Sequence, residues 1–265
     1  MLYDHVIVPF DGSGESRDVA VYAADLARVV GARLLLLTSA EVRGVAAIDR
    51  LKQRAVEISE QPVDVWIDAQ KRPADAVVKS VGYRPGSLVC MATHARTGLR
   101  KAVHGSIAED VIRGVDAPVL LFGPAWSPTE FFDPDRLLVC LDGSRTSEEV
   151  LPEAEAWRSV LDLDCTMVHV DLGDEHSLTH DPEVARRVAR LVEPFVEHGA
   201  ELSVMPGHDV PEAIVALTAT HPRSILAMAT HSRAGVARLT TGSITMDVVL
   251  RSEVPVLVRS AAHAG

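Results

Sequence analysis

Aromatic side chains are scarce in this chain. Three Trp, three Tyr and five Phe account for only 4% of its 265 residues, although 47% of the residues are hydrophobic. The hydrophobic content excludes a disordered chain. With so few rings, the core has to be built from Val, Leu, Ile and Ala, which is typical of parallel sheets covered by helices. The length allows one large domain or two of about 130 residues.

Cysteine is also rare. The three residues, Cys90, Cys140 and Cys165, form no Cys-x-x-Cys pair and no zinc-type Cys/His spacing. Cys90 and Cys140 lie inside apolar runs, and Cys165 begins another. We therefore expect buried free thiols in a reducing compartment rather than disulfides or a metal site.

Long hydrophobic runs are missing. None approaches the roughly 20 apolar residues that cross a bilayer. The opening residues, MLYDHVIVPFDGS, do not place a basic segment before an apolar one, as a signal peptide does. The sequence predicts a cytoplasmic protein with no membrane partner.

Basic residues are not in excess either. Lys and Arg number 26 and Asp and Glu number 37, for a formal net charge of −11. Residues 1–124 hold fifteen of each sign, so the acidic excess lies in the remainder of the chain. Without a basic footprint, nucleic acid is not an expected partner. The acidity is interpreted as a solubility feature.

Common catalytic motifs are absent as well. The sequence has no GxSxG, GxGxxG or Gly-Lys-Ser loop, and no nucleophile paired with a base. A group resembling metal ligands, His169, Asp171, Asp174, Glu175, His176, His180 and Asp181, is expected to be a solvated acidic loop after a strand, with metal binding as the lesser alternative. We therefore expect a binding protein rather than an enzyme.

What the chain does contain is an internal repeat. HVIVPFDGS near the start corresponds to RLLVCLDGS in the second half. MATHARTGLRKAVHGSIAEDV corresponds to MATHSRAGVARLTTGSITMDV. His94 and His231 are 137 residues apart, as are Gly105 and Gly242. A constant offset through this block indicates a duplicated domain.

Each copy alternates apolar strand-like runs with helical patterns. This alternation predicts an α/β fold with a parallel sheet and helices on both faces. We expect one domain over residues 1–124, a proline-containing linker over 125–134, and a second domain over 135–265. In the second copy, the segment SEEVLPEAEAWRSVL is expected to form one helix.

Three features of the first copy should meet beyond the carboxyl ends of its strands, where such sheets bind ligands. Asp11 follows the first strand, the run from Met91 to His94 follows the fourth, and Gly105-Ser106 begins a helix. A Gly-Ser at a helix start offers backbone N–H groups, a hydroxyl and the positive end of the helix dipole, which suit a phosphate. Simpler interpretations stay open, because Ser is a common helix cap, Asp-Gly-Ser a common turn, and His a frequent partner of backbone groups.

These motifs resemble the universal stress protein family in its tandem two-domain form. The resemblance covers both copies and implies a Rossmann-like domain with a five-stranded parallel sheet of order 3-2-1-4-5 in each. It implies an adenine nucleotide as ligand, ATP with or without Mg²⁺, and a role in stress response. Slow ATP hydrolysis is left open as an incidental activity. It also implies a homodimer as a candidate assembly.

The family's nucleotide motif is Gly, two residues, Gly, nine residues, Gly-Ser/Thr. Its last two residues fall on Gly105-Ser106 and Gly242-Ser243 at the family spacing. Its first two glycines fall on Ala92 and Ala95 in copy one and on Ala229 and Ser232 in copy two. Because alanine hinders close approach of a ligand to the backbone, a nucleotide-independent interaction scaffold is the alternative function.

The resemblance implies contacts for the nucleotide at corresponding positions of the two copies. In copy one they are Pro9, Asp11, Thr38, Met91, Ala92, His94, Ala95, Gly105, Ser106, Ile107 and Ala108. In copy two they are Asp142, Val170, Met228, Ala229, His231, Ser232, Gly242, Ser243, Ile244 and Thr245. If a single copy binds nucleotide, we expect it to be the first.

Overall fold

The structure of the protein is a computed structural model, and it divides the chain into two compact units. It describes residues 2–38, 45–58, 62–68, 72–93, 107–129, 131–172, 182–230 and 243–260. Unit 1 comprises Met1–Phe122 with Pro128–Phe132, and unit 2 comprises Gly123–Ser127 with Asp133–Gly265.

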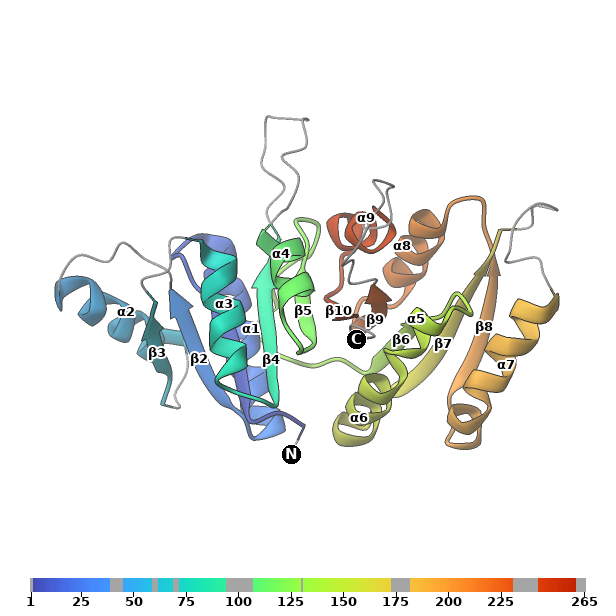
Figure 1. The fold of residues 1–265 in the computed structure, drawn as a ribbon, viewed down its shortest axis with the longest axis horizontal. Coiled ribbons are helices and arrows are strands. Elements are labelled where there is room, and N and C mark those ends of the chain that lie inside the picture. Colours follow the sequence, from blue (N-terminus) through green and yellow to red (C-terminus); the bar gives the residue numbers. More distant parts are fainter. Residues whose placement is uncertain are drawn as a thin grey trace. The chain divides into compact units, whose positions relative to one another are not determined.

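Unit 1 is a parallel sheet of five strands (Figure 1). Its strands lie in the order β3-β2-β1-β4-β5, which is the order that the resemblance implies. In chain order its elements are β1 (His5–Pro9), α1 (Gly14–Val30), β2 (Arg33–Thr38), α2 (Val45–Ile58), β3 (Asp64–Ile67), α3 (Pro73–Gly82), β4 (Ser87–Ala92), α4 (Ile107–Gly114) and β5 (Val119–Phe122).

Unit 2 repeats this arrangement. Its strand order is β8-β7-β6-β9-β10, again with parallel pairing between neighbours, so the predicted duplication of the fold is confirmed. Its elements are β6 (Arg136–Cys140), α5 (Arg145–Glu148), α6 (Leu151–Leu161), β7 (Asp164–Asp171), α7 (Pro182–Glu197), β8 (Glu201–Pro206), α8 (Val210–Thr220), β9 (Ser224–Thr230), α9 (Ser243–Arg251) and β10 (Val256–Ser260).

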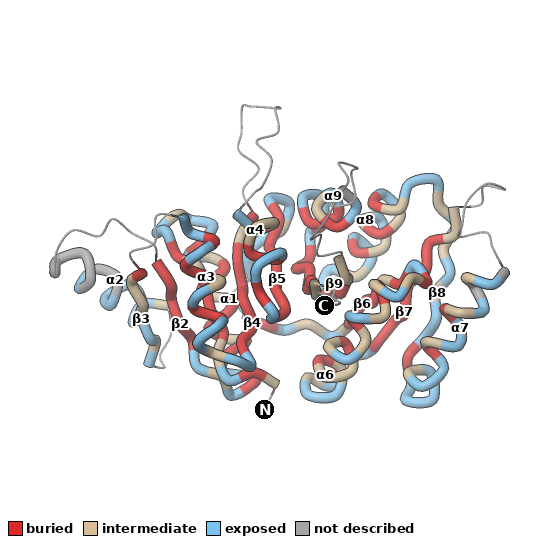
Figure 2. Tube along the Cα trace, viewed as in Figure 1, coloured by how far each residue is buried: buried red, intermediate tan, exposed pale blue. Residues whose placement is uncertain are grey.

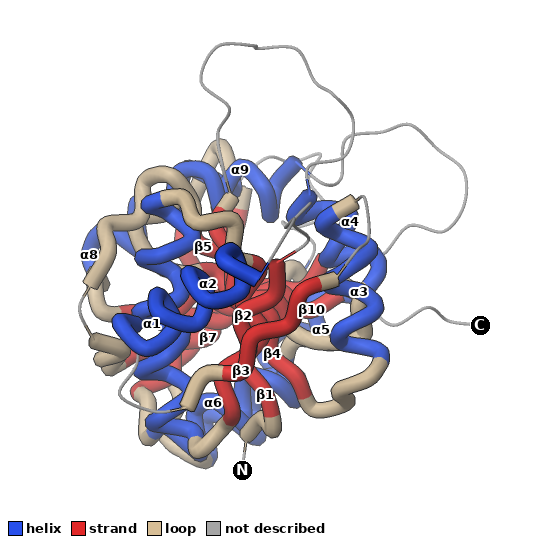
Figure 3. The backbone as a smooth tube through the Cα atoms, turned by 90° about the vertical axis from the view of Figure 1, so that its left-hand side faces the viewer, coloured by secondary structure: helices blue, strands red, loops and turns tan. Residues whose placement is uncertain are grey.

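Helices cover both faces of each sheet. In unit 1, α1 and α2 lie on one side of the strands and α3 and α4 on the other (Figure 3). Right-handed crossovers require this division, because the chain moves outward from β1 to β3 and then crosses back to β4 and β5. Because the five strands run parallel, their carboxyl ends meet at one edge of the sheet.

The core of each unit is aliphatic. Buried residues follow the central strands (Figure 2), among them Val6, Ile7, Leu88 and Val89 in unit 1. The corresponding central strands of unit 2 are buried in the same way. Val, Leu and Ile fill these positions because a strand covered on both faces exposes neither side to water.

Local sequence explains where the first helix of unit 1 begins and ends. The Ser13 hydroxyl accepts a hydrogen bond from the Ser16 N–H at 3.1 Å and caps the N-terminus of α1. Gly31 ends the helix in the left-handed region, at φ 72°. That conformation suits glycine, which has no Cβ to collide with the backbone.

The first helix of unit 2 differs from the sequence prediction. The single helix expected over SEEVLPEAEAWRSVL is two helices, α5 and α6, separated by Glu149 and Val150. Pro152 stands in the first turn of α6. Proline has no N–H to continue an existing helix, but it is well tolerated at the start of a new one.

Candidate functional site

The carboxyl edge of the unit 1 sheet brings together residues that are far apart in the sequence. Pro9, at the end of β1, pairs with Leu37, so Thr38 lies one residue beyond that level on β2. On the other side, β1 pairs with β4 in a parallel register, and Met91 and Ala92 end β4. The structure therefore places four predicted contacts on three adjacent strand ends. Pro9 and Ala92 are half-buried, whereas Thr38 and Met91 are buried.

The Asp-Gly-Ser motif forms a defined turn at this edge. One carboxylate oxygen of Asp11 accepts a hydrogen bond from the Ser13 N–H at 2.9 Å. Gly12 adopts φ 83°, in the left-handed region. The turn interpretation of Asp11 is therefore correct, and it leaves room for a binding role. A carboxylate has two oxygens with about four acceptor sites in total, and the Asp11 side chain is exposed.

Unit 2 builds the same turn. The Ser144 N–H donates to Asp142 at 2.8 Å, Gly143 has φ 77°, and the Ser144 hydroxyl accepts from the Ser147 N–H at 3.1 Å. Desolvation acts to raise the pKa of Asp142, but hydrogen bonds from Ser144 and Ser147 outweigh it, so the pKa lies below its ordinary value. The carboxylate is thus held ionised and oriented.

The starts of α4 and α9 also correspond in detail. The first-turn residue Ile107 is 45% exposed and its counterpart Ile244 is 42% exposed, while the following residues, Ala108 and Thr245, are buried. Both helices leave backbone N–H groups without intrahelical acceptors in their first turn, as every helix does. An apolar side chain beside the N-terminus of a helix at both positions is compatible with a ligand that has a flat organic part and an anionic part.

Charges near these helix starts differ between the units. The first turn of α4 contains Glu109 and Asp110, and Asp110 is paired with Arg72 at 2.8 Å. The first turn of α9 contains no acidic residue. Carboxylates in a first turn compete with phosphate for the positive end of the helix dipole. The ion pair with Arg72 reduces that competition in unit 1.

Several predicted contacts lie outside the described residues. These are His94, Ala95, Gly105, Ser106, His231, Ser232 and Gly242. Ser243 is described as the first residue of α9. Ala92 and Ala229, which stand in place of the motif's first glycine, lie in regular strands, and among described residues only Asp162 is a non-glycine with positive φ. The backbone at these two positions therefore does not itself require glycine.

The register corrects the expected correspondence between the copies. The Phe10 N–H bonds to the Leu37 carbonyl, and the Leu141 N–H bonds to the Val168 carbonyl. The residue after Val168, His169, is thus the counterpart of Thr38, where Val170 was expected. By the same register Cys140, the last residue of β6, corresponds to Pro9. Val170 lies one residue further along β7, so its side chain points to the opposite face of the sheet from that of His169.

His169 does not belong to a solvated loop, contrary to expectation. It is buried within β7, with Nδ1 2.8 Å from the Leu141 carbonyl oxygen. Asp171 is also part of β7, whereas Asp174, Glu175, His176, His180 and Asp181 lie outside the described residues. Within the part of the chain that the structure describes, no three His, Cys, Asp or Glu side chains are grouped as metal ligands.

The three cysteine thiols are poorly suited to nucleophilic chemistry. Cys90 and Cys165 are buried and Cys140 is half-buried, and none of the three forms a disulfide. Burial raises the pKa of Cys140 to about 12 and that of Cys165 to about 11. These thiols therefore stay protonated near neutral pH, where a thiolate would be needed for nucleophilic reactivity.

Sequence reasoning missed a cleft beside the Asp11 turn. Arg54 of α2 reaches back to this turn, with Nη1 3.4 Å from the Gly12 carbonyl oxygen. Arg17 of α1 lines the same cleft. The two arginines are 37 residues apart on different helices, and no local pattern in the sequence connects them.

Comparisons with known proteins agree with the fold. A curated universal stress protein of Methanocaldococcus jannaschii is 25% identical over 141 residues, which cover 45% of this chain and 82% of the relative. A universal stress protein structure from Archaeoglobus fulgidus superposes with a TM-score of 0.68 at 19% identity and covers 99% of this chain and 100% of its own. A putative universal stress protein from Pseudomonas aeruginosa gives 0.67 at 16% identity and covers 97% and 93%.

The family assignment rests on the sequence pattern of the domain. Within the described residues, no helix is long and apolar enough to cross a membrane. The pattern that defines the Universal stress protein family matches residues 2–123 and again residues 134–259. The two matches correspond to the two five-stranded sheets described above. The chain therefore belongs to the Universal stress protein family and carries its domain twice.

Proposed function

We propose that this protein is a cytoplasmic stress-response regulator that binds an adenine nucleotide, ATP with or without Mg²⁺, at the carboxyl edge of its sheets. The observation that carries the proposal is the convergence of Asp11, Thr38 and Met91 on adjacent strand ends. Unit 2 offers a corresponding edge with Asp142 and Met228. Open carboxyl edges of parallel sheets are the usual ligand sites of this architecture.

The described residues fit the chemistry of a nucleotide. The exposed carboxylates of Asp11 and Asp142 are fixed by their turns and can accept hydrogen bonds from ribose hydroxyls or an amino group. Ile107 and Ile244 present apolar surface of the kind that packs against a base. The first-turn N–H groups of α4 and α9 suit phosphate oxygens. Binding, rather than bond cleavage, is the role that these groups support.

Calorimetric titration with ATP and Mg²⁺ tests the proposal. Wild-type protein should give saturable heat, and Asp11→Asn should weaken binding at unit 1 by about tenfold, since it removes a charged acceptor but keeps the oxygen that holds the turn. Asp142→Asn makes the same change in unit 2. Asp18→Asn, on α1, is the matched control and should leave the affinity unchanged.

No heat and no thermal shift at millimolar ATP would refute nucleotide binding. In that case the alternative, a nucleotide-independent scaffold, gains support. Its motivation is the alanine at positions 92 and 229. Ala92→Gly addresses this directly: if the methyl group obstructs a ligand, glycine should tighten ATP binding. ATP found in stoichiometric amount in purified protein by mass spectrometry would count against the scaffold.

A further inference from the structure

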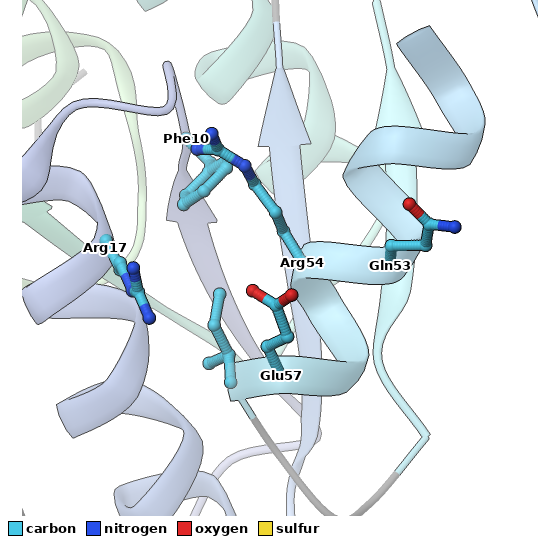
Figure 4. A pocket seen from close by; sticks show the side chains of 6 residues that line it. Phe10, Arg17, Gln53, Arg54 and Glu57 are labelled. Atoms are coloured by element: carbon cyan, nitrogen blue, oxygen red, sulfur yellow. The ribbon is translucent and has the colours of Figure 1, made fainter. Parts of the chain in front are cut away.

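A polar cleft lies between α1 and α2 of unit 1 (Figure 4), and Arg54, which lines it, contacts the Asp11-Gly12 turn. Its volume is about 270 Å³, near the lower end of small-molecule pockets. The lining residues are Phe10, Arg17, Gln53, Arg54, Glu57 and Ile58. Figure 4 shows Arg17 on the wall formed by α1 and Arg54 and Glu57 on the wall formed by α2. None of these residues is among the expected nucleotide contacts.

The charges of the cleft are incompletely compensated. Arg17 and Arg54 bring two guanidinium groups to the cleft, and within the described residues neither forms an ion pair with a carboxylate. The hydrogen bond that Arg54 forms is with the Gly12 carbonyl, which is neutral. Glu57 supplies a single negative charge on the same wall. Guanidinium groups are well suited to phosphate recognition, because each can donate two parallel hydrogen bonds to phosphate oxygens.

Unit 2 provides an internal comparison. Counting from the Asp-Gly-Ser turn, the counterpart of Arg17 is Glu148, which has the opposite charge. Glu148 of α5 forms an ion pair with Arg187 of α7, so in unit 2 the helices that correspond to α1 and α2 are joined by opposite charges. The Gly143 turn in that unit faces the apolar side chains of Val184 and Val188, where the Gly12 turn faces Arg54. In unit 1, by contrast, α1 and α2 each place an arginine at the cleft, and an anionic ligand could neutralise these two charges.

We propose that this cleft binds a small phosphate monoester, with its phosphate between Arg17 and Arg54. Such a group carries about −1.5 to −2 charges near neutral pH, enough to offset two arginines beside Glu57. The organic part would lie against Ile58, which is half-buried, and Glu57 would accept a hydrogen bond from a hydroxyl group of the ligand. The site goes beyond the proposed nucleotide function and does not depend on it.

Phenyl phosphate is a suitable probe, because it combines the dianion with a small apolar group. The measurement is the ¹⁵N–¹H NMR signal of the arginine Nε groups of the full chain, titrated at constant ionic strength and assigned with the variants. Saturable shifts of the Arg17 and Arg54 signals are expected. Arg17→Gln and Arg54→Gln should each weaken binding by about tenfold.

Two further variants sharpen the test. Lys52→Gln removes one positive charge from the same helix without touching the cleft, and it should bind phenyl phosphate as wild type does. Arg17→Glu reproduces the charge of unit 2 and should abolish binding. Shifts that fail to saturate, that appear equally with sodium sulfate, or that weaken as much in Lys52→Gln as in Arg54→Gln would overturn the proposal.

Discussion

The ring of Phe132 meets the ring of Tyr22 edge to face, with 5.3 Å between centroids and 79° between planes. Phe132 lies in the segment 128–132, which packs on unit 1 although it follows that unit's last strand. Its N–H also donates to the Asp25 carboxylate of α1 at 2.9 Å. The segment expected from sequence to be a linker thus contains a residue that completes the core of the first unit.

Removing this ring should destabilise unit 1 specifically. Phe132 is 7% exposed, and Phe132→Ala should lower the free energy of unfolding by about 3–5 kcal/mol. Its neighbour Phe131 is 63% exposed, so Phe131→Ala should change stability by less than about 0.5 kcal/mol. Hydrogen exchange of β1 and β6 peptides separates the two units. Equal effects of the two variants on β1 would contradict the proposed packing.

The two Asp-Gly-Ser turns should respond differently to the same substitution. Gly12 and Gly143 both have positive φ, and alanine there costs about 1–2 kcal/mol from the backbone alone. A Cβ at Gly143 would also lie 2.8 Å from Cγ1 of Val184, whereas at Gly12 the nearest atom is the mobile end of Arg54 at 3.4 Å. Gly143→Ala should therefore cost at least about 1 kcal/mol more than Gly12→Ala. Urea unfolding, with amides of β6 and β1 as reporters, measures both; the opposite order would show that α7 yields to the methyl group.

The buried thiols should make the protein sensitive to alkali. Folding raises the pKa of Cys140 from 9.0 to about 12. Below about pH 9 the thiol is protonated in both states, so it adds no pH dependence. Above this pH the unfolded chain loses the proton first, and stability falls by up to about 1.4 kcal/mol per pH unit for each such thiol. When urea unfolding is measured at pH 8 and at pH 10, the free energy of unfolding of Cys140→Ala should fall less between the two pH values than that of the wild type. Identical losses would mean that Cys140 ionises freely in the folded state.

Sequence reasoning succeeded where the determinants were local or repeated. Ser13 and Gly31, which cap α1 in the structure, are residue types that commonly begin and end helices. The duplicated motifs predicted two similar domains, and the family resemblance supplied the strand order. The Asp11 turn could also be predicted, since Asp-Gly-Ser is a turn sequence whatever follows it.

It failed where the outcome depends on spacing or on contacts between distant residues. His169 corresponds to Thr38 at the same offset of 131 residues that relates Asp142 to Asp11, whereas we expected the counterpart one residue further on, at Val170. Pro152 divided a segment whose apolar periodicity favoured one helix. Phe132 and Arg54 owe their roles to partners 110 and 42 residues away, Tyr22 and Gly12, and no short motif records such a pairing.

Because Arg17 and Glu148 carry opposite charges at corresponding positions, the two units are not interchangeable, and the ratio in which a cell makes them matters. Unit 1 has an open cleft between α1 and α2, whereas unit 2 joins the corresponding helices with an ion pair. If two genes encoded such unlike halves, their ratio would vary with expression, and like halves could associate with like. A single polypeptide fixes the ratio at one to one at every protein concentration, so the specialised half is always made together with its counterpart.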